Sequence, residues 1–327
     1  MHMNSIADNP KLVSFDGLFS AIVPCKNEED MIPIFYENFI AEMAKFQNPN
    51  FEIIFIDDGS TDYTLNQLKQ LATKDSRVKY ISFSRNFGKE AAMYAGFKHA
   101  KGDFVAIMDA DLQDPPSLLT EMFQKIKDCD CVATRRSTRT NEPPVRSFFA
   151  RLFYKVLNLL SPLKFKEGAR DFRLMRRRVV DEILRMGEVN RFLKGMYEWV
   201  GFKTEWIEYE NCPRVAGQTK WSLAGLGLYS VEAFTSFSTV PLAIVSVVGL
   251  AFCLLSLVAI IFVSIRQLMF HNSAFGWTSM VCILFFLSGL QLFCLGIIGQ
   301  YMSKIYLETK RRQPYIIQEA NIDIPEL

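Results

Sequence analysis

Two stretches near the end of the sequence, residues 241–263 and 276–302, contain no charged side chain. Each is longer than the roughly 20 apolar residues that a helix needs to span a bilayer. Because backbone polar groups in lipid must be hydrogen-bonded within the protein, we expect each stretch to form a helix. Two buried core helices are the alternative, but soluble domains rarely contain uncharged stretches of this length. The sequence therefore predicts two transmembrane helices joined by a short external loop at residues 264–275.

Positive charges beside these stretches predict how the chain is oriented. Four basic residues follow the second stretch: Lys304, Lys310, Arg311 and Arg312. Arg266 is the only lysine or arginine in the loop between the stretches. Since lysine and arginine are enriched on the cytoplasmic side, we expect both termini, including the tail at 303–327, to be cytoplasmic. The N-terminal tail, residues 1–16, contains no apolar segment typical of a cleavable signal peptide.

Ahead of the apolar stretches, three short apolar runs each end in polar residues. The runs are residues 18–23, 51–56 and 104–108. Helical patterns near residues 31–46, 61–74 and 89–100 separate short β-branched and aromatic runs. This alternation predicts βαβ units and a parallel sheet. Because right-handed crossovers bring the carboxyl ends of parallel strands to one edge, we expect Asp58, Asp109 and Asp111 to converge there.

The pair Asp109 and Asp111 is a candidate cation site. Two carboxylates one residue apart suit a divalent cation that holds a diphosphate. An isolated pair of this kind is also common in solvated turns, so its position at a strand end matters. In the neighbouring pair, Asp57 and Asp58, adjacent side chains point apart, and we expect one of the two to cap a turn or helix.

Eight motifs together carry a family resemblance: residues 23–29, 57–60, 84–92, 109–116, 170–173, 190–192, 214–221 and 296–301. They resemble the family 2 glycosyltransferases that load sugars onto polyprenyl phosphate, a group that includes bactoprenol glucosyltransferases and dolichyl-phosphate mannose synthases. The resemblance covers nearly the whole chain. It implies an α/β fold with a Rossmann-like GT-A catalytic domain at residues 17–222, on the cytoplasmic side, followed by the two-helix transmembrane hairpin.

The same resemblance implies roles at the donor end of the site. Asp111 corresponds to the direct ligand of Mg²⁺ or Mn²⁺, Gln113 can join it, and Asp109 holds ribose or a metal-bound water. The nucleotide base is expected against Pro24 and Glu28. Asp58 is expected to accept from the ring N–H that uracil and guanine share. Lys89 is either a neighbour of the nucleotide sugar or a surface charge at a helix start.

For the acceptor, the resemblance implies a lipid phosphate gripped by four basic residues: Arg170, Arg173, Arg214 and Lys220. Arginine suits bidentate phosphate binding. A phosphate monoester has a second pKa near 6, so at neutral pH it is largely dianionic and needs alignment more than deprotonation. Asp171, the third residue implied in catalysis, is either a general base or a residue that orients the arginines.

The function implied is inverting, metal-dependent transfer of one sugar, glucose from UDP-glucose first of all, to undecaprenyl phosphate in a bacterial cytoplasmic membrane. Transfer of N-acetylhexosamine, mannose or aminoarabinose would use the same layout. A processive polysaccharide synthase and a non-catalytic membrane scaffold are alternatives of other classes. The net charge of +2 gives no reason to expect nucleic acid binding.

Two amphipathic stretches, residues 147–160 and 223–240, are candidates for helices lying in the membrane interface. A helix packed on the sheet would show a similar pattern at 147–160. Residues 135–146 lack hydrophobic periodicity and are expected to form a loop over the site. The basic run at 176–178 is expected on a solvated or headgroup-facing surface. Exposed amphipathic helices also make a homo-oligomer plausible.

Overall fold

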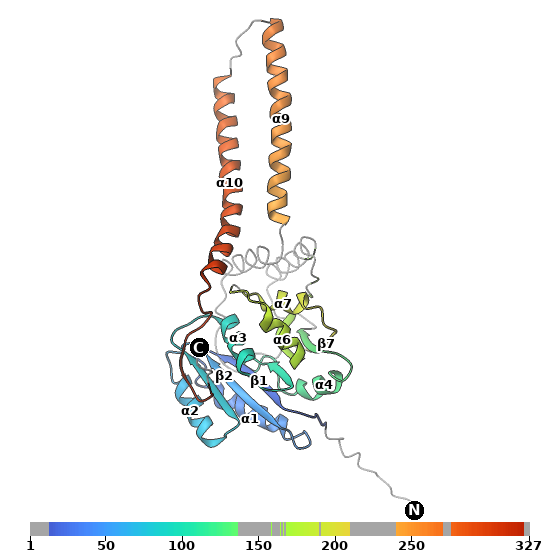
Figure 1. The fold of residues 1–327 in the computed structure, drawn as a ribbon, viewed down its shortest axis with the longest axis vertical. Coiled ribbons are helices and arrows are strands. Elements are labelled where there is room, and N and C mark those ends of the chain that lie inside the picture. Colours follow the sequence, from blue (N-terminus) through green and yellow to red (C-terminus); the bar gives the residue numbers. More distant parts are fainter. Residues whose placement is uncertain are drawn as a thin grey trace, which may run out of the picture. The chain divides into compact units, whose positions relative to one another are not determined.

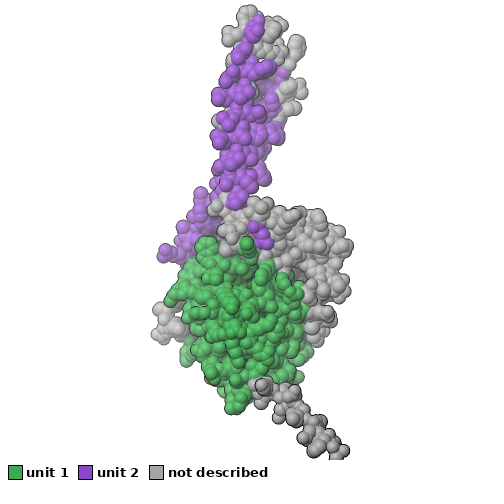
Figure 2. Space-filling view, turned by 90° about the vertical axis from the view of Figure 1, so that its right-hand side faces the viewer, with its two compact units in different colours: residues 1–155, 163–222, 312–327 green, residues 156–162, 223–311 purple. Residues whose placement is uncertain are grey.

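The computed structural model describes two compact units, which are coloured in Figure 2. It describes residues 13–136, 158, 164, 166, 168–189, 191–209, 240–270 and 276–323. Several predictions lie outside these residues: the helix at 147–160 apart from one residue, nearly all of the helix at 223–240, and the loop beyond residue 136. The two units are considered separately.

The first unit alternates strands and helices along the chain (Figure 1). Its elements are β1 (Phe19–Cys25), α1 (Met31–Met43), β2 (Phe51–Asp57), α2 (Thr64–Lys74), β3 (Val78–Phe83), α3 (Lys89–His99), β4 (Phe104–Ile107), α4 (Leu118–Lys125), β5 (Cys131–Arg136), β6 (Ala169–Arg176), α6 (Arg177–Arg185), α7 (Leu193–Trp199), β7 (Thr204–Tyr209) and β8 (Ile317–Ala320). The predicted strands and helices up to β4 are confirmed.

The described strands form one sheet in the order β7-β5-β6-β4-β1-β2-β3-β8. Strands β4, β1, β2 and β3 are parallel, as predicted. Strand β6 runs antiparallel to both β4 and β5, and β8 runs antiparallel to β3, so the complete sheet is mixed. Together with the two apolar helices of the second unit, this mixed α/β sheet confirms the predicted fold class.

Alternating side chains of β1 pack against helices on both faces of the sheet. Ala21 and Val23 belong to an aromatic-rich core with side chains from α1, α2 and α4, among them Phe35, Phe39, Leu68, Leu119 and Phe123. Ile22 points to the other face, where α3 lies close because of Gly96. A Cβ at Gly96 would lie 2.2 Å from the Ile22 side chain, so a larger residue would push α3 away from the sheet.

The predicted C-terminal tail contains the last strand of the sheet. Strand β8 pairs with the edge of β3, which would otherwise leave its backbone groups unpaired. The Asn321 side chain accepts from the Tyr80 amide at 2.6 Å and donates to the Val78 carbonyl at 3.1 Å. Glu319 accepts from the Tyr80 hydroxyl at 3.0 Å and pairs with Lys69 at 2.7 Å. Residues 312–323 therefore belong to the first unit.

The basic run at 176–178 lies where β6 passes into α6, at the end of the sheet where β4 begins. Arg176 donates to two backbone carbonyls of the α4–β5 connection at 2.8 and 3.1 Å. Arg177 donates to the Ala100 carbonyl at 2.6 Å. Arg178 pairs with Asp130, and its side chain is the most exposed of the three. The expected solvated surface therefore applies to Arg178, whereas the other two arginines bind backbone.

The second unit contains two long helices, α9 (Val240–Phe270) and α10 (Trp277–Lys310) (Figure 1). The segments Val240–Val258 and Ile283–Lys310 are apolar enough to cross a membrane by length and composition. Helix α9 continues past the predicted span into the predicted loop, because residues 264–270 contain no proline or glycine. The helices contact each other, with the Phe252 and Phe286 rings 5.9 Å apart.

Candidate active site

The candidate site lies at the carboxyl ends of β1, β2 and β4. Strand β1 sits between β2 and β4, so the strand order reverses beside it. In open α/β sheets, ligands bind at such a switch point, beyond the carboxyl ends of the strands. Asp58 follows β2 and Asp109 follows β4, and both therefore lie along this edge, as predicted.

Asp57 and Asp58 both order the loops of this edge. The buried Asp57 carboxylate accepts from the Ser60 amide at 3.0 Å and the Ser82 hydroxyl at 2.7 Å, which confirms that one of the pair stabilises a turn. Asp58 accepts from the amides of Phe87 at 2.6 Å and Gly88 at 3.0 Å. Burial raises the pKa of Asp58, while these amides oppose the rise. Asp58 thus fixes the loop that leads into α3.

The loops after β1 and β2 are joined by hydrogen bonds beside Pro24 and Glu28. The Glu28 amide donates to the Thr64 hydroxyl at 2.9 Å. The Asn27 side chain accepts from the Thr61 amide, also at 2.9 Å. Pro24 and Glu28 are both half-buried at this edge. The predicted base-binding residues are therefore held in place, and their contact with a nucleotide stays a prediction.

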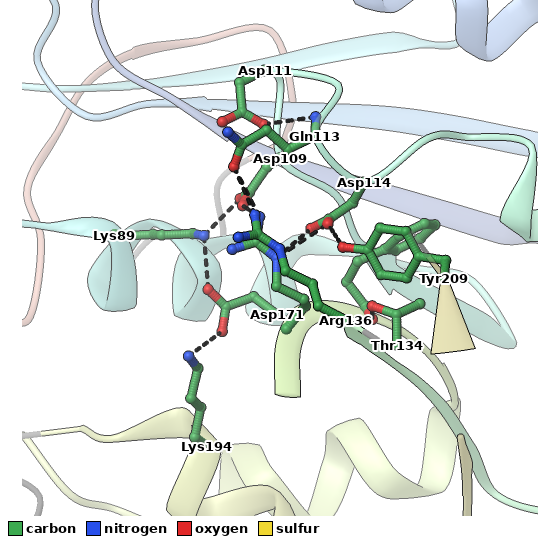
Figure 3. A network of polar contacts seen from close by, with 12 residues as sticks. Lys89, Asp109, Asp111, Gln113, Asp114, Thr134, Arg136, Asp171, Lys194 and Tyr209 are labelled. Atoms are coloured by element: carbon green, nitrogen blue, oxygen red, sulfur yellow. Dashed lines mark hydrogen bonds and ion pairs between the residues drawn. The ribbon is translucent and has the colours of Figure 1, made fainter. Parts of the chain in front are cut away.

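The segment after β4 turns sharply at Leu112, whose φ of 55° lies in the left-handed region. The turn lets the Asp111 carboxylate accept from the Gln113 amide at 3.1 Å. The Gln113 side-chain oxygen accepts from Arg136 at 3.0 Å and Arg170 at 3.4 Å. Asp111 and Gln113 consequently face the same small region from one tight loop (Figure 3).

Charges of alternating sign form a row beside this loop (Figure 3). Lys89 contacts Asp109 at 2.6 Å and Asp171 at 2.8 Å. Lys194 contacts the other oxygen of Asp171 at 3.8 Å. Burial alone would raise the pKa of Asp171, but the two lysines hold it well below its usual range. Burial lowers the pKa of Lys89, and Asp109 and Asp171 more than reverse this effect. Lys89 therefore belongs to the same charged cluster as Asp109, Asp171 and Lys194.

Asp114 is a residue whose part in the site we did not predict. Its fully buried carboxylate binds the Arg170 guanidinium at 3.1 and 3.2 Å and accepts from the Tyr209 hydroxyl. Burial raises the pKa of Asp114, and Arg170 opposes this rise. Held in this way, Arg170 lies 3.9 Å from Asp109. The sequence feature that could have identified Asp114 is its position as the third carboxylate of the Asp109–Asp114 segment, directly before two prolines.

Of the four basic residues predicted to grip the acceptor phosphate, Arg170 reaches the cluster and Arg173 does not. The Arg173 side chain is 2% exposed, and its guanidinium lies 3.8 Å from the centre of the Tyr197 ring. Residues three apart on a strand face opposite sides of a sheet, so the two arginines diverge. The contact of Arg173 with the acceptor phosphate stays a prediction. Arg214 and Lys220 lie outside the described residues.

The residues present fit a divalent cation shared with a diphosphate. No group of three or more histidine, cysteine, aspartate or glutamate side chains suited to a metal occurs among the described residues. Mg²⁺ in phosphate-transfer sites is commonly held by one or two carboxylates, with substrate phosphates and waters as further ligands. Asp109 and Asp111 match this donor set. The Gln113 oxygen accepts from two guanidinium groups, and its predicted role as a cation ligand stays a prediction.

Comparisons with known proteins show what the chain is similar to. Residues 20–184 match the model described as Glycosyl transferase family 2. The chain is 42% identical to CsbB, a glycosyltransferase candidate of Bacillus subtilis (strain 168), with 95% of each chain covered. It is 40% identical to the bactoprenol glucosyl transferase of Shigella phage SfV, with 91% of this chain and 97% of the relative covered. The solved mannosyltransferase PcManGT from Pyrobaculum calidifontis, in complex with GDP-Man and Mn²⁺, aligns over 68% of this chain and 64% of that chain with 18% identity and a TM-score of 0.47.

Proposed function

This chain belongs to glycosyl transferase family 2, and from that membership we propose that it transfers one sugar from a nucleotide donor to a polyprenyl phosphate. The observation that carries the proposal is the cluster at the switch point, where Asp109 and Asp111 lie beside Lys89 and Arg170. It offers acidic groups for a cation and basic groups for phosphates within one site. The name of the phage relative, bactoprenol glucosyl transferase, supports the lipid acceptor and glucose as the sugar.

For the donor, we propose that Asp111 and Asp109 hold Mg²⁺ or Mn²⁺ together with the diphosphate. A bound cation would supply Lewis-acid stabilisation of the leaving diphosphate. Pro24, Glu28 and Asp58 line the base end of the same edge. Asp58 keeps its loop closed through the Phe87 and Gly88 amides, and we propose that it also accepts from the base N–H.

For the acceptor, we propose that the lipid phosphate attacks the sugar directly, with inversion. A phosphate with a second pKa near 6 already carries a nucleophilic oxygen at neutral pH. Asp171 lies between two lysines, which favours its ionised form over the pH range of an assay. A general base needs a pKa near the working pH, so this arrangement favours an orienting role for Asp171. Its carboxylate would hold Lys89 and Lys194 toward the phosphates.

We propose that the two apolar helices form a membrane hairpin, with the catalytic unit and both termini in the cytoplasm. Helix α10 ends at Lys310, and the basic residues at this end, Lys304, Lys310 and Arg311, favour the cytoplasmic side. Nucleotide sugars and the phosphate end of the lipid would then meet on one membrane face. A bacterial cytoplasmic membrane is the location that this reading implies.

The direct test uses the full-length protein in detergent with undecaprenyl phosphate and a panel of radiolabelled UDP- and GDP-sugars. We expect one sugar, glucose from UDP-glucose first of all, to appear in a lipid product, and Asp111→Asn to yield none. A labelled lipid from another donor would correct the sugar and keep the acceptor. A labelled polymer would indicate a processive synthase, and no transfer from any donor would reject the proposed activity.

A further inference from the structure

One face of α3 contacts the segment that begins α7. Glu90 and Tyr94 are four residues apart and so lie on the same face of the helix. The Glu90 carboxylate accepts from the Leu193 amide at 3.1 Å, and Leu193 is the first residue of α7. The Arg191 guanidinium lies 3.3 Å from the centre of the Tyr94 ring. Two independent contacts therefore fix the start of α7 against α3.

These contacts lie next to the charge row of the site. Lys194 directly follows Leu193 and contacts one oxygen of Asp171 at 3.8 Å. Lys89 directly precedes Glu90 and contacts the other oxygen at 2.8 Å. The two lysines thus come from different helices, and the contact between Glu90 and Leu193 joins those helices at the positions next to the lysines. A shift of α7 along α3 would move Lys194 relative to Asp171.

We propose that Glu90, supported by Tyr94, is a positioning residue that sets Lys194 opposite Lys89 for binding of the acceptor phosphate. In this proposal Glu90 acts on the α7 backbone, to which its carboxylate is hydrogen-bonded. Its effect is transmitted through the position of Lys194. The inference rests on the proposed function, since it takes lipid phosphate to be the acceptor.

The charges around Glu90 give this contact a pH dependence. The titratable groups that face it are Asp171 from β6, Lys194 and Tyr197 from α7, and Lys89 from α3 itself. Burial and Asp171 raise the pKa of Glu90 to about 7, against the Leu193 amide and the two lysines. As the pH falls through this value, the carboxylate loses its charge and its hydrogen bond to α7 weakens.

The test measures KM for undecaprenyl phosphate and for the UDP-sugar separately, with the full-length protein in detergent. For Glu90→Ala we expect the lipid KM to rise about tenfold, the loss expected for one hydrogen bond to a charged group, with the donor KM within about twofold. Glu90→Gln keeps an acceptor oxygen but not the charge, so its lipid KM should lie between those of the wild type and Glu90→Ala. Between pH 8 and pH 6, the wild-type lipid KM should rise more steeply than that of Glu90→Gln. The phosphate itself titrates equally in both proteins.

Matched variants separate this role from a general loss of structure. Glu121→Ala removes an exposed glutamate of α4 that pairs with Lys125, and its kinetics should equal the wild type. Tyr94→Phe keeps the ring under Arg191, whereas Tyr94→Leu removes it, so only the leucine variant should raise the lipid KM. The Tyr94 pair tests the proposal even where Glu90→Ala does not fold.

If the wild type is active and the lipid KM is unchanged in both Glu90→Ala and Tyr94→Leu, the inference is overturned while the proposed function stands. So would a loss confined to the donor KM. A wild type that transfers sugar to no lipid phosphate would reject the proposed function and this inference with it.

Discussion

Replacing Asp114 with asparagine should destabilise the catalytic unit, because it removes the counter-charge of a mostly buried guanidinium. Asp114 is 0% exposed, the Arg170 side chain is 23% exposed, and their closest atoms lie 3.1 Å apart. Removing one partner of a buried ion pair costs about 3–5 kcal/mol. Asparagine still offers one acceptor oxygen, so we expect the lower end, about 3 kcal/mol. Arg170 should also lose its fixed position beside Asp109, and transfer activity should fall.

Thermal unfolding of the full chain in detergent measures this cost. Because 1 kcal/mol shifts the midpoint by about 2–4 °C in a domain of 150–250 residues, Asp114→Asn should lower Tm by about 6–12 °C. Tyr209→Phe removes only the hydroxyl that Asp114 accepts from, a loss of about 1 kcal/mol. The double variant Asp114→Asn with Arg170→Met leaves no uncompensated charge and should recover part of the loss.

The reasoning would be refuted by a Tm for Asp114→Asn no lower than that of Tyr209→Phe. It would also be refuted if the Asp114 and Arg170 substitutions were simply additive, because additivity would show that the two charges do not interact.

Three further predictions test the cation, a surface charge pair and the topology. Asp111→Asn should abolish cation-dependent UDP binding in calorimetry without changing the circular dichroism spectrum, since an amide is a poorer ligand for a hard cation; retained Mn²⁺-dependent binding would remove Asp111 from the site. Hydrogen bonds from Arg77 lower the pKa of Asp75 to about 2, so its stabilisation is present above the unfolded value near 3.9 and is lost as the pH falls through 2. With Arg77 partly exposed, Asp75→Asn should cost about 1 kcal/mol in urea unfolding at pH 7, and this difference should shrink below pH 4; a constant difference would contradict the assignment. In intact cells lacking other reactive cysteines, an external reagent should label a cysteine at position 272 and not one at the exposed Gln318, and the reverse pattern would put the catalytic unit on the wrong side for cytoplasmic donors.

The edge of the parallel sheet could be predicted because it depends on local pattern. Apolar runs that end in Asp58 and Asp109, with helical segments between them, specify the strands, and crossover handedness then brings their ends together. The positions of the residues that complete the site depend on contacts between segments far apart in the sequence. Asp114 meets Tyr209 from β7, 95 positions later in the sequence, and no local pattern marks the loop carboxylate as buried.

The arginines of β6 show a second limit. Their motif resembles a phosphate-binding segment, but the strand itself was not predicted, so its alternation could not be used to divide Arg170 from Arg173. Lys194 was missed for a related reason. It lies on α7 and contacts Asp171 of β6, a tertiary contact that side-chain spacing does not encode.

The position of β8 has a consequence for biosynthesis. Its partner β3 is made before both apolar helices, whereas β8 is made after them, and Tyr80 and Asn321 are separated by 241 positions. At about 5–20 residues per second, the ribosome needs on the order of 12–50 s to bridge that separation. During this interval β3 presents an open edge to other nascent chains. The catalytic sheet is therefore completed only after both apolar helices have been synthesised, and a chain that stops before residue 315 keeps that edge open.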